Sequence, residues 1–505
     1  MKFCPECGTK LVTQKFCQEC GCNISKYLNN ANGLTSKENS SNDRSAVQNA
    51  AQKLSSALSQ RIDKISSDFE IENGVLKCYV GSDKEINVPE NVTTIGRNAF
   101  LSHGYNAEKI NLPKNLCAIE KYGLSGLGLV KEIKIPDTVY EIGQSAFVGC
   151  ANLQRVMLPR GLDELSESIF FSCSSLKEVI LPSSIKKIGR NAFYGCVSLE
   201  LINIPSSVTE IGVCAFEGCI SLQGIYLTNG IIKIGDGAFR NCNSIKEISI
   251  PNTVVEIGGA VFAGCSSLTN MKVGAGSQLQ KLGSHAFEKC TSLVEIAIPN
   301  AETEYGSPWM MYSLFGRADH IPQSLKKITV LRGNSVQQEA FLHCDSVEEI
   351  ILPNNIIKIG KSAFSGCISL KKINLPNELR HIEQSAFSGC RSLTDLIFPS
   401  SLKSIGSYAF RGCYALKQVS IPNNLLSLGE RAFVDCDSIY VISIPSQLRE
   451  IGSDALGGNE KKIIYRGRYA DFYENSFIYL RALDEAIRTY GKVRISCQDR
   501  EFEFS

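Results

Sequence analysis

The chain has 505 residues and a formal net charge of +2, with 21% charged and 43% hydrophobic residues. This balance offers neither a strongly basic surface for nucleic acid or anionic membranes nor an acidic tail. No run approaches the roughly 18 apolar residues of a membrane-spanning helix, and the first ten residues lack the apolar core of a signal peptide.

The first 26 residues contain two pairs of closely spaced cysteines. Cys4 and Cys7 form one CxxC pair, Cys17 and Cys20 form the second, and a glycine follows each pair. Two such turns supply four thiolates to one tetrahedral Zn²⁺, and so short a segment needs the metal to fold. We predict a structural zinc ribbon over 1–26, similar to short bacterial zinc-ribbon modules. A redox dithiol pair and a chance spacing are the alternatives. Four protein ligands would leave this zinc no open position for catalysis.

Residues 27–68 divide into a polar linker and a predicted helix. The stretch 29–45 is rich in Asn and Ser and has almost no apolar residues, which is typical of a flexible linker. From Ala46 to about residue 66, apolar residues recur at steps of three and four, which predicts an amphipathic helix. Three roles fit this helix: docking on the next segment, self-association as a short coiled coil, or contact with a partner.

Residues 69–81, FEIENGVLKCYVG, predict a β-hairpin. Two alternating apolar runs flank Asn73-Gly74, which is a strong signal for a tight turn. A repeat array must cover its terminal cores, so we interpret this hairpin as the cap of the segment that follows.

From residue 69 to 465 the chain repeats one phrase, mostly every 23 residues. A fixed period between 20 and 29 residues predicts a solenoid, one elongated array in place of several globular domains. Aligned on one apolar position, sixteen repeats carry Phe100, Leu124, Phe147, Phe170, Phe193, Phe216, Phe239, Phe262, Phe287, Phe315, Phe341, Phe364, Phe387, Phe410, Phe433 and Leu456.

Within one repeat the apolar spacing changes character. In LKEVILPSSIKKIGRNAFYGC (176–196), residues 176–181 alternate as a short strand that Pro182 ends, and 183–188 continue as an extended return. Ala192, Phe193, Cys196 and Leu199 then follow helical spacing. The sequence therefore predicts an α/β solenoid with one short parallel strand and a short helical turn per repeat. Stacking at about 4.8 Å per strand would give an arc of roughly 75 Å.

The phrase LxxVxLPxxIxxIGxxAFxxC resembles the BspA-like, surface-antigen type leucine-rich repeat, a family widespread in bacteria. The resemblance covers about residues 70–465. It implies a curved right-handed solenoid that binds proteins or other macromolecules without catalysis of its own. Many members are secreted. This chain departs from them, because it shows no export signal and carries the N-terminal cysteine pairs.

Twelve of the 21 cysteines close the repeated phrase. Free Cys behaves as a small hydrophobe and is often buried, so we predict an internal ladder of reduced thiols. Disulfides between neighbours or metal ligation are the alternatives, and disulfide pairing two by two would disturb a uniform register. Free thiols in this number indicate a reducing compartment, and we expect a cytoplasmic protein. The ladder comprises Cys150, Cys173, Cys196, Cys219, Cys242, Cys265, Cys290, Cys344, Cys367, Cys390, Cys413 and Cys436.

The residues on either side of each strand's central apolar position are expected to line the concave face. One column alternates in charge and should neutralise itself; it begins Glu85, Lys109, Glu132, Arg155, Glu178. The other column is smaller and mixed, and suits a partner better; it includes Asn203, Tyr226, Ser249, Lys272, Ala297 and Thr329. From this column we name Tyr226, Lys272 and Thr329 as candidate partner-binding residues.

The longest irregularity, 300–324, contains the only tryptophan of the chain, Trp309, followed by Met310 and Met311. Aromatic and Met-rich protrusions are common binding hot spots, so Trp309 is a further candidate. Packing within a long repeat is the alternative interpretation.

Residues 466–505 are expected to cap the other end of the array. Phe477, Leu480, Leu483 and Ile487 share one face of a predicted helix over 476–491, and 492–504 alternate like a hairpin.

These patterns predict a non-enzymatic scaffold that binds a protein or another macromolecule. The five histidines are scattered, and the glycines follow the repeat with no phosphate-binding loop among them. A nucleic-acid-associated protein that uses the ribbon is one alternative. It is weakened because residues 1–30 carry only four lysines against two glutamates, an excess that four zinc-bound thiolates would cancel. A surface adhesin exported by an unrecognised route is the other.

Overall fold

The computed structural model describes residues 68–274, 276–299, 310–457, 462–469, 479, 487 and 493–504. The predicted zinc ribbon, the predicted helix from Ala46 and Trp309 lie outside these residues. The chain divides into two compact units, Met1–Ser244 and Ile245–Ser505, called here the N-terminal and C-terminal units.

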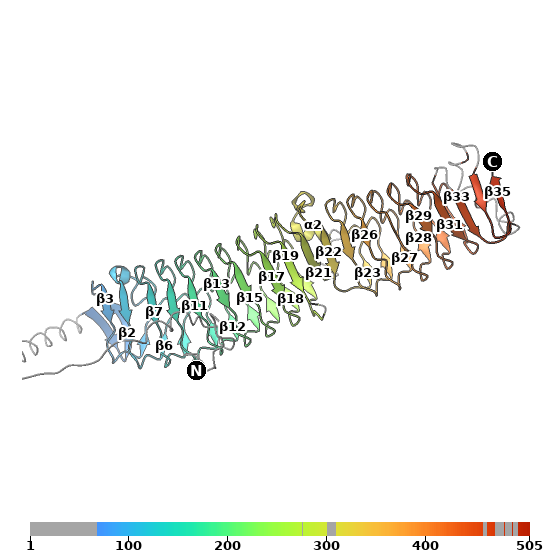
Figure 1. The fold of residues 1–505 in the computed structure, drawn as a ribbon. Helices are drawn as coiled ribbons and strands as arrows, with labels where there is room; N and C mark the ends of the chain where they lie inside the picture. Colours follow the sequence, from blue (N-terminus) through green and yellow to red (C-terminus); the bar gives the residue numbers. More distant parts are fainter. Residues whose placement is uncertain are drawn as a thin grey trace, which may run out of the picture. The chain divides into compact units, whose positions relative to one another are not determined.

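Each repeat of the N-terminal unit contributes a three-residue strand, called here an A strand. Neighbouring A strands pair in parallel, one repeat apart, as in β7–β9–β11 and β13–β15 (Figure 1). This is the short parallel strand that the sequence predicted. The A strands are β3 (Glu85–Asn87), β5 (Lys109–Asn111), β7 (Glu132–Lys134), β9 (Arg155–Met157), β11 (Glu178–Ile180), β13 (Leu201–Asn203) and β15 (Gly224–Tyr226).

The predicted extended return is a second strand, called here a B strand, so each repeat contains two strands where one was predicted. B strands form a parallel ladder of their own, as in β10–β12–β14–β16. They are β4 (Thr94–Ile95), β6 (Ala118–Ile119), β8 (Glu141–Ile142), β10 (Glu164–Leu165), β12 (Lys187–Ile188), β14 (Glu210–Ile211) and β16 (Lys233–Ile234).

The predicted helical turn around Phe193 is wrong, because this segment is a series of turns. Asn191 and Gly195 have positive φ angles of 53° and 70°, which an α-helix does not contain. The amides of Asn191, Phe193 and Gly195 donate to carbonyls of the following repeat at 2.7–2.9 Å, as a strand would, and not to carbonyls four residues back. The fold is therefore mostly strand and turn, and the expected α/β class is corrected accordingly.

The core of the N-terminal unit is a column of stacked phenylalanines. Phe170, Phe193 and Phe216 are fully buried, and successive ring centroids lie 5.3 and 5.1 Å apart. The inward residues of the A and B strands surround the column. The 23-residue period therefore repeats one set of contacts and extends a single apolar core along the unit.

The predicted N-terminal hairpin is present and covers the first repeat. β1 (Phe69–Glu72) and β2 (Val75–Tyr79) pair antiparallel, and β2 then pairs in parallel with β4. Tyr79 is buried, and its ring lies 5.8 Å from that of Phe100, so it covers the end of the phenylalanine column. The short 3₁₀ helix η1 (Gly104–Asn106) follows.

The C-terminal unit has the same two ladders. Its A strands are β17 (Glu247–Ile250), β19 (Asn270–Val273), β21 (Glu295–Ile298), β22 (Lys327–Val330), β24 (Glu349–Ile351), β26 (Lys372–Ile373), β29 (Gln418–Ser420), β31 (Val441–Pro445) and β33 (Lys462–Arg466). Its B strands are β18 (Glu256–Ile257), β20 (Lys281–Leu282), β23 (Ser335–Val336), β25 (Lys358–Ile359), β27 (His381–Ile382), β28 (Ser404–Ile405), β30 (Ser427–Leu428) and β32 (Glu450–Ile451).

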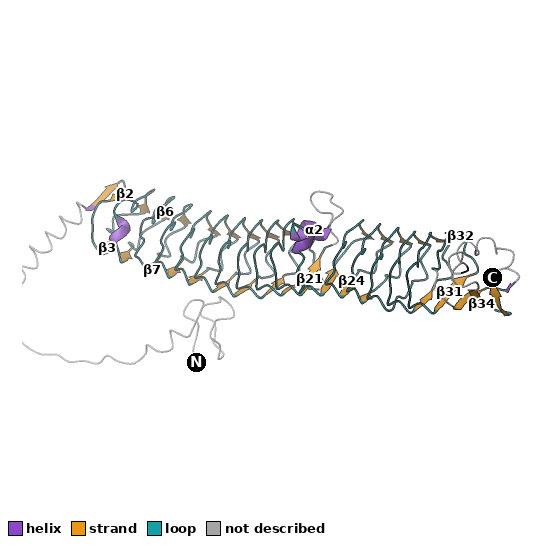
Figure 2. Ribbon diagram, turned by 90° about the horizontal axis from the view of Figure 1, so that it is seen from above, coloured by secondary structure: helices purple, strands orange, loops and turns teal. Residues whose placement is uncertain are grey.

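The long repeat around residue 310 holds the helix α2 (Met310–Phe315) and then the 3₁₀ helix η2 (Ala318–His320). Figure 2 shows α2 on the side of the coil away from the A strands β21 and β24. Met310 and Met311 are buried, and Phe315 joins the phenylalanine column 5.9 Å from Phe287. This segment therefore packs within the solenoid, which is the alternative that the sequence left open for its methionines.

The last strands close the C-terminal unit. β33 pairs in parallel with β34 (Val493–Ser496), which pairs antiparallel with β35 (Glu501–Phe504), so the hairpin predicted over 492–504 is present. Most of the helix predicted over 476–491 lies outside the described residues.

Candidate interaction surface

The outward side chains of the A strands form a surface, called here the A face. In β11 the central residue Val179 is buried, whereas Glu178 and Ile180 on either side are half-buried. The same alternation places one outward column on each side of the buried column. The pleat therefore separates the residues that hold the core from those that a partner could contact.

The predicted charge column of the N-terminal unit neutralises itself. Lys109 Nζ lies 2.6 Å from a carboxylate oxygen of Glu85. Arg155 lies 3.5 Å from Glu132 and 3.1 Å from Glu178, the two acidic residues on the strands beside it. Exposed pairs of this kind contribute only about 0–1 kcal/mol each. They do cancel the local charge, which makes this column a poor electrostatic attractor.

The candidate residue Tyr226 lies at the end of β15, in the other outward column of the N-terminal unit. Its side chain is 68% exposed, and its strand neighbour on β13 is Asn203. A tyrosine side chain this exposed brings a large apolar ring and a hydroxyl to the surface with little conformational entropy to lose on binding. Of the three A-face candidates, Tyr226 is the one best presented to a partner.

Lys272 and Thr329 belong to the same column in the C-terminal unit. Lys272 Nζ lies 2.5 Å from Glu247, and this hydrogen bond, with one from Asn270, holds the pKa of Glu247 below its usual range. Lys272 is therefore already paired. Thr329 is half-buried beside Ala297, which occupies the predicted outward position between Ile296 and Ile298 but is itself buried.

Sequence reasoning missed the most exposed apolar residue of this face, Ile397, which is 87% exposed. It lies in 394–398, a segment that forms no strand and stands where an A strand would come between the A strands β26 and β29. One repeat earlier, Asn374 occupies the position equivalent to Ile397. Its side-chain oxygen accepts from Leu352 N at 2.8 Å, and its side-chain nitrogen donates to Leu352 O at 2.9 Å. The only sequence signal that this repeat is irregular is the bulky Phe398 next to Ile397. The ring of Phe398 lies edge-on to that of Phe410, with centroids 5.5 Å apart.

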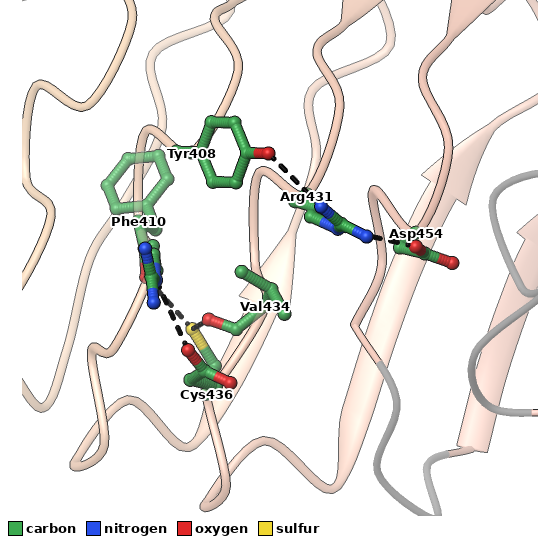
Figure 3. Close-up of polar contacts among 8 residues, drawn as sticks. Tyr408, Phe410, Arg431, Val434, Cys436 and Asp454 are labelled. Carbon is green, nitrogen blue, oxygen red and sulfur yellow. Dashed lines mark hydrogen bonds and ion pairs between the residues drawn. The ribbon is translucent and has the colours of Figure 1, made fainter. Parts of the chain in front are cut away.

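The twelve repeat cysteines are free and buried, as predicted. Ten of them donate the thiol proton to the carbonyl of the phenylalanine one repeat earlier or of Leu124, for example Cys173 to Phe147 at 3.1 Å. Figure 3 shows this contact for Cys436, which lies 3.0 Å from the Phe410 carbonyl oxygen, next to the Tyr408–Arg431–Asp454 chain of polar contacts. Burial raises the pKa of Cys150 to about 12 and raises the pKa values of Cys173, Cys196 and Cys219 well above the usual value, so these four thiols stay protonated and unreactive at neutral pH.

Two further features bear on function. Within the described ranges, no three His, Cys, Asp or Glu side chains are grouped so that they could hold a metal ion. Across the same ranges, no helix is both long and apolar enough to cross a membrane.

Comparison with known proteins identifies the family to which the repeat belongs. The model of the family described as BspA type Leucine rich repeat region (6 copies) matches residues 70–200, 186–314 and 334–462. No curated protein matches the chain.

Three solved structures are similar to this chain. A leucine-rich repeat protein from Bacteroides ovatus is 26% identical over 85% of this chain and 97% of its own, with a TM-score of 0.44. A leucine rich cell surface protein from Faecalibacterium prausnitzii is 22% identical over 80% and 94%, with a TM-score of 0.36. The pneumococcal vaccine antigen PcpA is 18% identical over 83% and 94%, with a TM-score of 0.27. Because the family model matches most of the repeats, this chain belongs to the BspA-type leucine-rich repeat family.

Proposed function

We propose that the protein is a non-enzymatic scaffold whose A face binds a protein or another macromolecule. The observation that carries the proposal is the exposed ring of Tyr226 on a surface whose buried positions are nearly uniform from repeat to repeat. A repeated core beneath varied outward residues is the arrangement that solenoids use for binding. Lys272, Thr329 and Ile397 are the corresponding positions of the C-terminal unit, and Trp309 is a further candidate outside the described residues.

Replacing Tyr226 with alanine is expected to weaken partner capture at least about tenfold, the size of a moderate hot spot, while the melting temperature stays unchanged. The matched control is Tyr140→Ala, because Tyr140 is 67% exposed but precedes the B strand β8. Both variants and the native chain are used as bait in the native cell, and captured proteins are quantified by mass spectrometry.

Equal capture by the native chain and the Tyr226→Ala variant would reject Tyr226 as a contact. The variants Lys272→Ala, Thr329→Ala and Ile397→Ala then test the C-terminal unit. If none of these lowers capture, the A-face proposal fails.

We further propose that Cys4, Cys7, Cys17 and Cys20 hold one structural Zn²⁺ in an accessory ribbon, and that the chain works in the cytoplasm, where its free thiols stay reduced. Elemental analysis of the full chain is expected to give one zinc per molecule, falling to well below one in a Cys4→Ser variant. A metal-free native chain, or full zinc in the variant, contradicts the ribbon.

A further inference from the structure

A row of backbone N–H groups follows the B strands, and most of these groups have no acceptor among the residues that the structure describes. The row is formed by the second residue after each B strand. In the C-terminal unit the amides of Gln384, Ser407 and Glu430 donate to no atom of the described residues. The preceding residue is usually glycine, and the beta carbon of any other residue at Gly406 or Gly429 would lie 2.5 or 2.3 Å from the amide nitrogen of Gln384 or Ser407.

Two repeats show which chemistry this row accepts. Where a glutamate replaces the glycine, its carboxylate bonds the free amide of the preceding repeat. Glu120 Oε2 accepts from Arg97 N at 2.9 Å, and Glu383 Oε2 accepts from Lys361 N at 3.1 Å. The two sites lie in different units, so the chain itself demonstrates twice that a carboxylate fits this amide.

A groove in the C-terminal unit is lined by residues of this row. Elsewhere the outward residue of the B strand is often long and charged, for example Lys187 and Glu210, which also pair at 3.1 Å. At β28 and β30 that residue is Ser404 and Ser427, and both serines line a groove of about 800 Å³ together with Gln384 and Ser407.

Two lysines and a histidine lie at one end of this groove. Lys361, Lys358 and His381 line it there, and Lys358 is neutralised by Glu383 at 2.6 Å. Lys361 is exposed and forms no ion pair within the described residues. His381 Nδ1 lies 2.8 Å from Ser404 Oγ. A lysine without a carboxylate, serine hydroxyls and free amides are the donors that an anion needs. The acidic residue of the lining at the far end is Glu450, three repeats beyond His381.

We propose that this groove binds a small ligand with two carboxylates. The carboxylates accept hydrogen bonds from the backbone amides of Gln384 and Ser407, beside Lys361. These amides belong to consecutive repeats, so they are spaced by about the 4.8 Å of neighbouring strands. The ligand would do what Glu383 and Glu120 do within the chain. The site lies on the B strands and is independent of the A-face proposal, so either one can fail without the other.

Glutarate is a suitable probe, because its extended chain separates two carboxylates by about the strand spacing of 4.8 Å. Calorimetric titration of the full chain at about 0.15 M ionic strength is expected to show saturable glutarate binding. The affinity for glutarate should be at least about tenfold higher than that for acetate or sulfate, because two charge-assisted hydrogen bonds made together are less weakened by salt screening.

Two variants with matched controls locate the site. Ser427→Glu fills the groove and is expected to weaken glutarate binding at least about tenfold, whereas Ser420→Glu adds the same charge on the A strand β29 and is expected to leave it unchanged. Lys361→Met is expected to weaken binding about threefold to tenfold, and Lys417→Met, an exposed lysine beside β29, should not. The proposal is overturned by absent glutarate binding, by acetate or sulfate binding equally well, or by equal losses in the variants and their controls.

Discussion

Replacing Phe193 with alanine is expected to destabilise its part of the N-terminal unit by about 3–5 kcal/mol. Phe193 is fully buried between Phe170 and Phe216, with ring centroids at 5.3 and 5.1 Å. The truncation removes the transfer free energy of the ring, leaves a cavity and breaks both ring stacks, each of which is worth about 0.5–1.5 kcal/mol. Hydrogen exchange resolved by repeat measures the loss, because a solenoid can open locally.

The control for this experiment is the next residue, Tyr194. Its ring stacks on that of Phe171 at 4.7 Å, but both side chains are half-buried. Tyr194→Ala is expected to cost about 0.5–1.5 kcal/mol, chiefly the ring pair. Faster exchange should centre on residues 170–216 in the Phe193 variant. Similar costs for the two variants would mean that the phenylalanine column does not dominate the stability of the core.

The buried half of the fold was predictable because it repeats. A phenylalanine such as Phe193 recurs at the same position of the 23-residue repeat. Such recurrence is required only where the position has the same environment in every repeat. The same logic identified the alternation within β11 and the buried state of the cysteines. The hairpins at both ends followed from local turn and alternation signals.

There is a physical reason why the extended returns were not recognised as B strands and why the turns were predicted as helical. A two-residue strand such as Lys187–Ile188 is too short for an alternation to be visible in the sequence. Around Phe193, the spacing of the buried residues imitates a helix, but the hydrogen bonds run to the next repeat. Spacing reports which side chains point inward. It does not report whether the backbone bonds itself or its neighbour.

The outward surface could be predicted only in part. Tyr226 was visible as a large aromatic residue in a column of smaller ones. Ile397 could not be predicted as exposed from its place in the repeat. Ile180 occupies the same repeat position in the regular ladder, and there it is half-buried. Ile397 lies in 394–398, which forms no strand, whereas Ile180 lies in β11, which pairs with β9.

Replacing Gly189 with alanine is expected to destabilise the N-terminal unit by about 1–3 kcal/mol, although only one methyl group is added. Gly189 is buried directly after β12, and its amide donates to Leu165 O at 2.8 Å. A beta carbon there would lie 2.4 Å from the same oxygen and 2.9 Å from the Glu167 amide nitrogen. Both are backbone atoms of the preceding repeat, so the two repeats must separate to admit the methyl group.

The matched control is Gly161→Ala in the same unit. Gly161 is exposed and has no atom within 4 Å of the added methyl group, so its replacement should be neutral or should stabilise by up to about 1 kcal/mol through the unfolded state. Urea unfolding of both variants, followed by repeat-resolved hydrogen exchange, separates the two effects. Ser166 occupies the position equivalent to Gly189 one repeat earlier, where its hydroxyl bonds the Ile142 carbonyl. If Gly189→Ala costs nothing, the repeat around residue 189 admits a beta carbon as the repeat around Ser166 does, and close backbone approach is not what requires glycine there.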